Sequence, residues 1–186
     1  MDRRILKTQE KLFQAYIDLL HRNASDYITV QLLTATASIH RVTFYKHYKD
    51  LIQFQDAFIH YHISSLYNFM KPLNYKAYEK GFEYEQLVLL LEHIAQHQST
   101  YTTLLASENI PEFNKRLLTY FQVQLTKHTE ELAKFDFPGI HVDQEIVAWY
   151  GVSALFGTII LWVQSGFKYA PKQLAQSIIK LTPNHE

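Results

Sequence analysis

The stretch ITVQLLTATASIHRVTFYKHYKDL, residues 28–51, decides how this chain is organised. It contains two short helical segments, 30–36 and 40–47, with a tight connection at Ser38 between them. Two short helices joined in this way are typical of a helix-turn-helix, whose second helix enters the major groove of DNA. Three ordinary helices of a bundle give the same periodicity, so the side chains must decide between these interpretations.

The second short segment, HRVTFYKH, is too short and polar to bury much of itself. Only Val42 and Phe44 are apolar. Its remaining side chains carry hydrogen-bond donors: His40, Arg41, Thr43, Tyr45, Lys46 and His47. Hydroxyl, imidazole and guanidinium groups suit phosphates and base edges. The residue types therefore favour nucleic-acid binding.

The flanking sequence continues the helical pattern. Thr29 and Asp50 have the side chains of helix N-caps, the first for segment 30–36 and the second for a long helix over 51–69. Further helices are predicted at 4–22, 83–97, 99–107, 111–134, 143–166 and 172–181, with a loop at 72–81 and a break at Pro138-Gly139. We therefore expect an all-α chain of about nine helices. It divides into a three-helix helix-turn-helix domain, 1–50, which we expect to bind DNA, and a helical domain, 51–186.

Composition excludes several classes of protein. Of the 186 residues, 47% are hydrophobic, which excludes a disordered chain. The absence of cysteine excludes a disulfide scaffold, a thiolate metal site and a cysteine nucleophile. The opening MDRRILKTQEK has no apolar segment of a signal peptide, so we expect a cytoplasmic protein. Residues 1–50 carry eight Lys and Arg against five Asp and Glu, a balance of +3, and residues 51–186 a balance of −3, so the N-terminal part is the one suited to an anion.

Residues 28–51 resemble the DNA-binding segment of the TetR family of transcriptional regulators, whose pattern is roughly T-V-x-x-I-A-x-x-A-G-V-S-x-x-T-F-Y-x-H-F. The matching residues are Thr29, Val30, Leu33, Ala37, Ile39, Thr43, Phe44, Tyr45, His47 and Tyr48. The opening helix resembles the family too, so the match covers about residues 3–60. Three positions depart from the pattern. Ser38 replaces a usual Gly and predicts backbone strain, His40 replaces a usual Ser and can serve as a cap, and Leu51 replaces a usual Lys.

The resemblance implies a role for each polar residue of the segment. The residues expected to contact phosphates are Thr29, Thr43, Tyr45, His47 and Lys49. Those expected to contact base edges are His40, Arg41, Val42 and Lys46. Arg41 has the two-pronged donor that reads guanine, and Val42 can meet a thymine methyl.

The segment 146–167 carries no charge over 22 residues. Its length allows a membrane span, but polar and small residues interrupt it, which favours a buried helix in a subunit interface. Ser153 and Gly157, four residues apart, let a second helix approach closely. This region also resembles the last two helices of a TetR C-terminal subgroup, through Trp162, Gly166, Pro171, Leu174 and Ala175. The resemblance implies a four-helix bundle between two subunits, with candidate dimerisation residues Ser153, Gly157, Leu161, Leu174 and Ile178.

The resemblance implies that 51–186 is a helical ligand-binding and dimerisation bundle, with an effector site between the two matching regions. Aromatic residues there are candidates for that site, with ordinary core packing as the competing interpretation. They are Phe58, His62, Tyr67, Tyr101, Phe121, Trp149 and Phe156. His93 and His97 have the i, i+4 spacing of metal ligands, but no third ligand is evident, so we expect no metal and no cofactor.

These observations predict a homodimeric, sequence-specific DNA-binding regulator, a repressor, that binds a palindromic operator on double-stranded DNA. A small apolar or aromatic effector is expected to release it, because no Lys or Arg lies between Lys80 and Lys115 to hold a strongly anionic one. We expect no membrane partner. One alternative is a co-regulator with the same fold that acts through a protein partner. The other is an all-α enzyme, which the absence of catalytic motifs disfavours.

Overall fold

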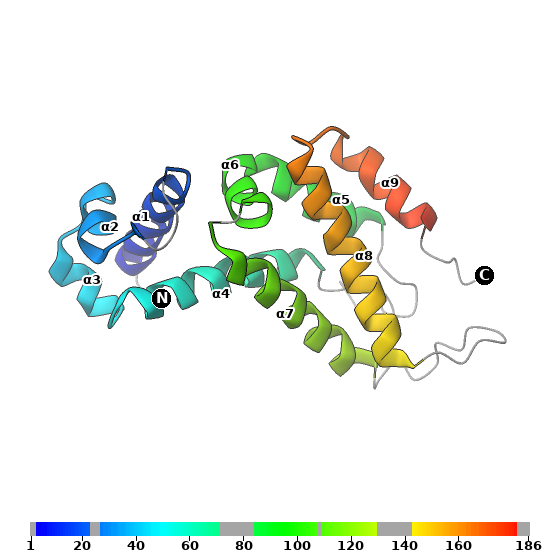
Figure 1. Cartoon of the computed structure of the whole chain (residues 1–186), viewed down its shortest axis with the longest axis horizontal. Coiled ribbons are helices and arrows are strands. Elements are labelled where there is room, and N and C mark those ends of the chain that lie inside the picture. The colour runs from blue at the N-terminus through cyan, green and yellow to red at the C-terminus, as the bar shows by residue number, and fades with distance from the viewer. Residues whose placement is uncertain (1–2, 23–26, 71–83, 108, 130–142, 182–186) are drawn as a thin grey trace. The chain divides into compact units, whose positions relative to one another are not determined.

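The computed structural model describes residues 3–22, 27–70, 84–107, 109–129 and 143–181 (Figure 1). Within these residues the chain forms nine α-helices, one π-helical turn and no strand, which confirms the all-α prediction. The helices are α1 (Arg3–Leu20), α2 (Val30–Thr36), α3 (Arg41–His47), α4 (Leu51–Met70), α5 (Tyr84–Gln96), α6 (Gln98–Tyr101), α7 (Pro111–Thr129), α8 (Gln144–Gln164) and α9 (Pro171–Leu181), with the π-helical turn η3 (Thr102–Ala106) after α6. The predicted loop at 72–81 and the break at Pro138-Gly139 lie outside the described residues. No helix in the described part is both long and apolar enough to cross a bilayer.

The chain divides into two compact units. Unit 1 contains Met1–His62 together with Ser107–Pro111, and unit 2 contains Ile63–Ala106 together with Glu112–Glu186. The division falls inside α4, whereas the boundary predicted from the sequence lies at the start of that helix. A single unbroken helix therefore belongs to both units.

Aromatic rings form the core of unit 1. Phe13 and Tyr16 of α1 meet Phe54 and Phe58 of α4, with centroid separations of 5.2 Å for Phe13–Phe58 and 5.3 Å for Tyr16–Phe54. Both pairs are edge-to-face, the arrangement that the ring quadrupole favours. Phe44 of α3 joins this cluster through Phe54 at 5.8 Å and is fully buried. One ring thus fixes the short α3 to α4, next to the rings of α1.

The ends of α2 follow the sequence prediction. The Thr29 side chain accepts a hydrogen bond from the amide of Leu32, which confirms the predicted N-cap. Ser38 has a φ of 53°, and its amide donates to the carbonyl of Ala35 at 3.1 Å. The next amide, of Ile39, donates to the carbonyl of Thr34 at 2.9 Å. This pair of hydrogen bonds is a Schellman motif, which requires the left-handed conformation at Ser38.

The expectation that the His40 side chain caps α3 is wrong. His40 has the extended backbone of an N-cap, with φ −68° and ψ 139°, but its side chain makes no capping hydrogen bond. An imidazole ring is bulkier and reaches further than a serine hydroxyl, so it does not fold back onto the first turn. The Asp50 prediction is confirmed, because its Oδ1 accepts from the amide of Gln53 at 2.8 Å.

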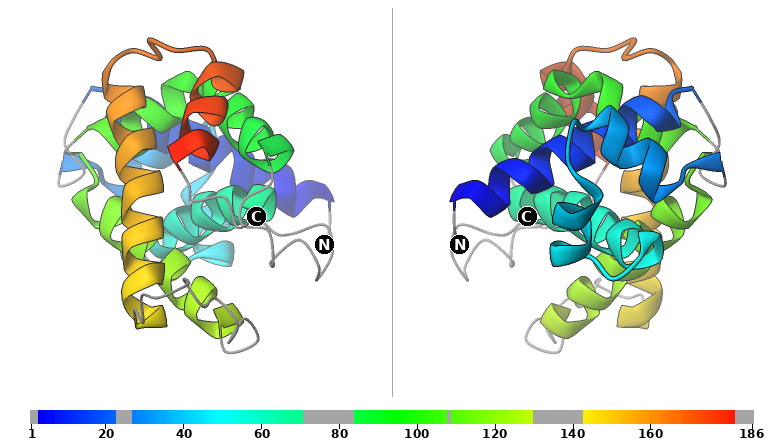
Figure 2. Two further views of the ribbon diagram at one scale, coloured as in Figure 1. Left: turned by 90° about the vertical axis from the view of Figure 1, so that its right-hand side faces the viewer. Right: turned by 90° about the vertical axis from the view of Figure 1, so that its left-hand side faces the viewer.

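In unit 2, α5 packs against α9 and α8 packs against η3 (Figure 2). Phe121 of α7 and Phe156 of α8 meet at a centroid separation of 4.5 Å. The turn from α8 to α9 is held by Trp162, whose Nε1 donates to the carbonyl of Tyr169 at 2.8 Å. The ring of Trp162 also contacts Phe167 at 5.0 Å. These contacts fix where α9 begins.

Replacing Ser38 by glycine is expected to stabilise the chain. The substitution removes the Cβ that disfavours a positive φ, and the larger entropy of glycine in the unfolded chain offsets part of that gain, leaving about 0.5–1 kcal/mol. Urea unfolding followed by circular dichroism measures the change. Ser177→Gly is the matched control, because Ser177 lies in the regular helix α9 and there the same change destabilises. A Ser38→Gly protein less stable than the parent would contradict the strain argument.

Candidate functional site

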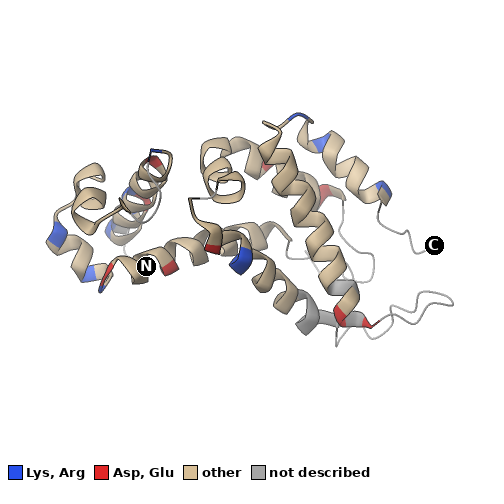
Figure 3. Cartoon of the chain, viewed as in Figure 1, with Lys and Arg blue, Asp and Glu red and all other residues tan. Residues whose placement is uncertain are grey.

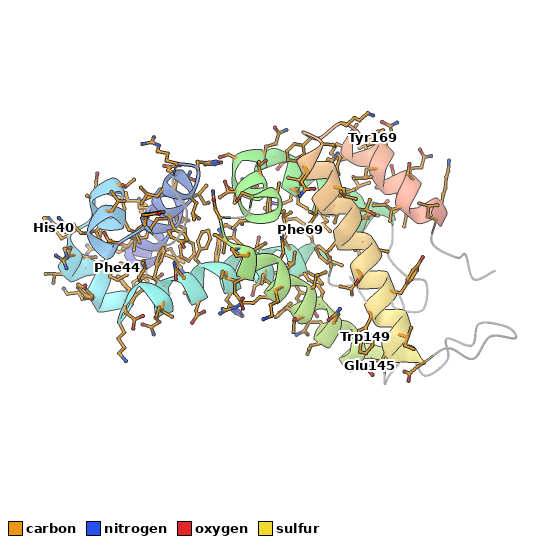
Figure 4. The ribbon with its side chains drawn as sticks, in the orientation of Figure 1. His40, Phe44, Phe69, Glu145, Trp149 and Tyr169 are labelled. Carbon is orange, nitrogen blue, oxygen red and sulfur yellow. The ribbon has the colours of Figure 1, made fainter. Side chains whose placement is uncertain are left out.

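Helix α3 exposes three of its five polar side chains to solvent. Arg41, Val42, Tyr45 and Lys46 are exposed, and Val42 is 70% exposed although it is apolar. Phe44 points into the core from the same helix, and Figure 4 labels it together with the exposed His40. The helix carries Lys and Arg and no acidic residue (Figure 3). All four residues predicted to reach base edges, His40, Arg41, Val42 and Lys46, are therefore accessible on one short element.

The residues predicted to contact phosphate lie on and beside α3. Tyr45, Thr29 and Lys49 are exposed, and Thr43 and His47 are half-buried. Because the Thr29 oxygen acts as an acceptor in its cap, its O–H remains a donor for a phosphate oxygen. The structure thus leaves each of the five donors within reach of an anion, and their contact with DNA stays a prediction.

Gln53 has a role that was not predicted from the sequence. Its Oε1 accepts from the backbone amide of Lys49, while its own backbone amide donates to Asp50. These two hydrogen bonds tie the start of α4 to the segment that carries Lys49. The sequence signal was present, because Asp50 and Gln53 have the three-residue spacing of a capping box.

One face of α8 is uncharged and largely exposed. Ile146, Tyr150, Ser153 and Leu161 are exposed at helical spacing along it, and Gly157 between them is half-buried. Tyr150 is 77% exposed and Leu161 66%. Large apolar side chains left exposed in a row along a helix mark an interaction surface.

The two candidate dimerisation residues of α9 lie in different environments. Ile178 is half-buried, whereas Leu174 is only 7% exposed and belongs to the core of unit 2, where α9 packs against α5. The side chain of Leu174 is thus already covered by its own chain. The exposed face of α8 is the better basis for an interface.

The seven candidate effector residues do not share one environment. Phe58 and His62 belong to unit 1, where both rings contact Phe13 in the aromatic core. In unit 2, Phe121 lies between Tyr67, at 5.8 Å, and Phe156, at 4.5 Å. Tyr101 is also buried in unit 2, and Trp149 on α8 is 47% exposed. The effector role of this set stays a prediction, and Tyr67, Phe121 and Phe156 are the members that the structure brings together.

A polar pair lies in the same unit. His93 Nε2 is 2.8 Å from the hydroxyl of Tyr101, and the ring of His93 stacks on Phe69 at 4.5 Å. Burial and the neighbouring His97 lower the pKa of His93 to about 4, so this ring is neutral at pH 7. Among the described residues no three potential ligands gather into a metal site.

A family model matches the C-terminal half of the chain. Residues 83–184 match the TetR C-terminal model described as a transcriptional regulator C-terminal region, which is more than half of the chain. The chain belongs to the TetR family of transcriptional regulators. A search of curated proteins gave no significant match.

Solved structures of TetR regulators share the fold. A TetR regulator from Streptococcus agalactiae is 24% identical, with a TM-score of 0.65, and the alignment covers 97% of this chain and 96% of that one. A TetR-family regulator from Syntrophomonas wolfei is 12% identical with a TM-score of 0.68, and the alignment covers 94% and 92%. Regulators of this family are DNA-binding transcription factors rather than enzymes. The exposed α3 is therefore the helix expected to meet DNA in this TetR regulator.

Proposed function

We propose that this TetR regulator binds a palindromic operator as a homodimer and represses transcription from it. The observation that carries the proposal is the arrangement of α3, where only Phe44 is buried and the donors Arg41, Tyr45 and Lys46 are exposed. Such a helix has little surface to contribute to the core, and its donors match the acceptors of phosphates and of the major groove. A two-fold dimer presents two copies of α3, so its site has two-fold symmetry.

The uncharged face of α8 supports the dimer. Its exposed aromatic and aliphatic side chains need a cover, and a second copy of the same face is self-complementary across a two-fold axis. Gly157 lies at the centre of this face, and a Cβ built on it meets no atom of its own chain within 4 Å. The space above Gly157 is thus open to a partner helix.

We propose further that a small apolar or aromatic effector releases the dimer from DNA. The buried rings of Phe121 and Phe156, with the half-buried ring of Tyr67 beside them in unit 2, offer stacking surfaces of the kind that such ligands use. Among proteins of similar fold, the transcriptional regulator FadR from Bacillus subtilis has been solved in complex with stearoyl-CoA, and DhaS is an activator of a dihydroxyacetone kinase operon. The class of effector, and whether the protein represses or activates transcription, therefore both need measurement.

Selection from random duplex DNA is expected to enrich a palindrome. On the enriched duplex, Arg41→Ala should weaken binding by about 1–3 kcal/mol and relax preference at one base pair in each half-site. Arg116→Ala is the matched control, since it removes the same charge from α7, where Arg116 pairs with Glu112 at 3.1 Å. Enrichment of no symmetric site would contradict the proposal. A reporter response that survives Arg41→Ala would instead favour action through a protein partner.

Gly157→Leu is expected to convert the dimer into monomer or aggregate. A Cβ at Gly157 meets no atom of its own chain within 4 Å, so the loss is expected to arise against the partner helix. Gly151→Leu is the matched control, because Gly151 is also open to solvent but lies at the edge of the face. Sedimentation velocity at micromolar concentration compares the two. A parent chain that is monomeric there would remove the basis of the interface.

Neutral aromatic compounds are expected to raise the melting temperature of the chain and to release it from its operator. A full switch needs about 10⁴-fold tighter binding to the released form. Stearoyl-CoA is the comparison ligand, and a weaker response to this anion is expected because 81–114 contains no Lys or Arg. Phe121→Leu should reduce the response. Binding without any change in operator affinity would show a site but no switch.

A further inference from the structure

The charged residues that flank the exposed face of α8 are of opposite sign at its two ends. Asp143 and Glu145 stand at the start of the helix, and the next charged residue is Lys168, after 22 uncharged positions. Figure 3 shows the acidic residues at the beginning of α8 and the basic ones at and beyond the turn to α9. The face is therefore acidic at one end and basic at the other.

The charges of Glu145 and Lys168 are not neutralised by the described part of their own chain. Both side chains are exposed, and neither forms an ion pair with another described residue. The Nζ of Lys168 lies 5.6 Å from the centroid of the Tyr169 ring, which is itself exposed. A cation–π contact in such a position is weak. Both charged groups are thus available to a partner outside the chain.

Two copies of this face can meet with their α8 helices parallel or antiparallel. A parallel pair places Glu145 beside the same residue of the other copy, and likewise Lys168, so like charges oppose each other at both ends. An antiparallel pair places the acidic end of each copy beside the basic end of the other. Opposite charges attract and like charges repel, so the antiparallel arrangement is favoured.

The spacing of the charges along α8 fits an antiparallel crossing at Gly157. Glu145 precedes Gly157 by 12 residues, and Lys168 follows it by 11. At about 1.5 Å per helical residue, Glu145 lies about 18 Å from the crossing point, and the helix runs about 10 Å beyond that point before the turn that carries Lys168. Each Glu145 therefore comes beside that turn of the other copy when the helices cross at the shallow angle typical of bundles.

We propose that two copies of α8 pack antiparallel at Gly157, and that reciprocal ion pairs between Glu145 of each copy and Lys168 of the other fix the register and select a second copy of this chain as the partner. The proposal rests on the proposed homodimer. The pairs lie at the rim of an uncharged face, where charges contribute more to the choice of partner than to affinity. A relative with different charges at these two positions would be rejected.

Subunit exchange between the parent and a charge-swapped chain tests the arrangement. The variant Glu145→Lys with Lys168→Glu keeps the net charge and should form its own antiparallel dimer. In a mixed dimer, however, like charges would meet at both ends. Native mass spectrometry with one protein ¹⁵N-labelled counts the species. We expect mixed dimers to fall from about half, the random share, to below about one fifth, which corresponds to a roughly 5- to 30-fold bias over two rim pairs.

Two controls separate the charge pairing from other effects of the substitutions. Glu85→Lys with Lys115→Glu reverses the same charges away from α8, and Glu85, like Glu145, is an exposed residue in the first turn of its helix. This variant should mix at random with the parent. Exchange in about 0.5 M salt should bring the charge-swapped protein close to random mixing as well, because salt screens exposed pairs.

Single variants decide the question if the double variant does not fold. Glu145→Lys and Lys168→Glu each place like charges in their own dimers, so an equimolar mixture of the two should contain more than about four fifths mixed dimers. Glu145→Lys and the parent should mix at random in the antiparallel arrangement, because their mixed dimer holds one attractive and one repulsive pair. In a parallel arrangement the same two proteins would prefer each other.

The outcomes distinguish this proposal from the dimer on which it rests. Random mixing of the parent with the charge-swapped chain, at low salt, would overturn the ion pairs and leave the homodimer standing. An excess of mixed dimers in that experiment would overturn the antiparallel direction. A parent chain that sediments as a monomer would remove the homodimer itself, and the charge pairs with it.

Discussion

The burial of Phe44 is the constraint on which the DNA-binding unit depends. A helix of seven residues is too short to persist in water by its own hydrogen bonds. The buried ring of Phe44 alone packs α3 against the aromatic cluster of α1 and α4. The other positions of the helix are thereby freed from packing. Phe44 thus holds α3 in place, while other residues of the same short helix carry its polar groups.

Helix α8 shows the opposite arrangement, because its two faces are both largely apolar. One face, with Phe156 and Trp162, fills the core of unit 2, and the other remains open along Tyr150 and Leu161. A helix that is apolar all round is stable in water only when both faces are covered. The chain itself covers one of them. The need to cover the second apolar face of α8 explains why this transcription regulator contains an uncharged segment with the length of a membrane span.

Local features of the fold could be predicted from the sequence because neighbouring residues determine them. The caps at Thr29 and Asp50 and the positive φ of Ser38 follow from side chains within three or four positions, and the structure shows all three. Features that join distant residues could not. The bond from Asn109 to Leu20 spans 89 positions and has no local signal. The packing of Phe58 against Phe13 places that ring in unit 1, with His62, rather than with the effector candidates of unit 2. The failed cap at His40 shows that a residue can take the backbone conformation of a cap without the side-chain bond.

The chain passes between its two units three times, once inside α4 and once at each end of residues 107–111, and this limits how the protein can be recombined with its relatives. A single crossover placed inside α4 would join the first 62 residues of one parent to residues 107–111 of the other. Asn109 and the end of α1 would then come from different sequences, and a poor match leaves the carbonyl of Leu20 without its partner. Exchange of DNA specificity between such regulators is therefore easier by changing the exposed residues of α3 than by swapping whole domains. Residue changes that alter operator preference can accumulate on α3, while the rest of the chain is inherited as one piece.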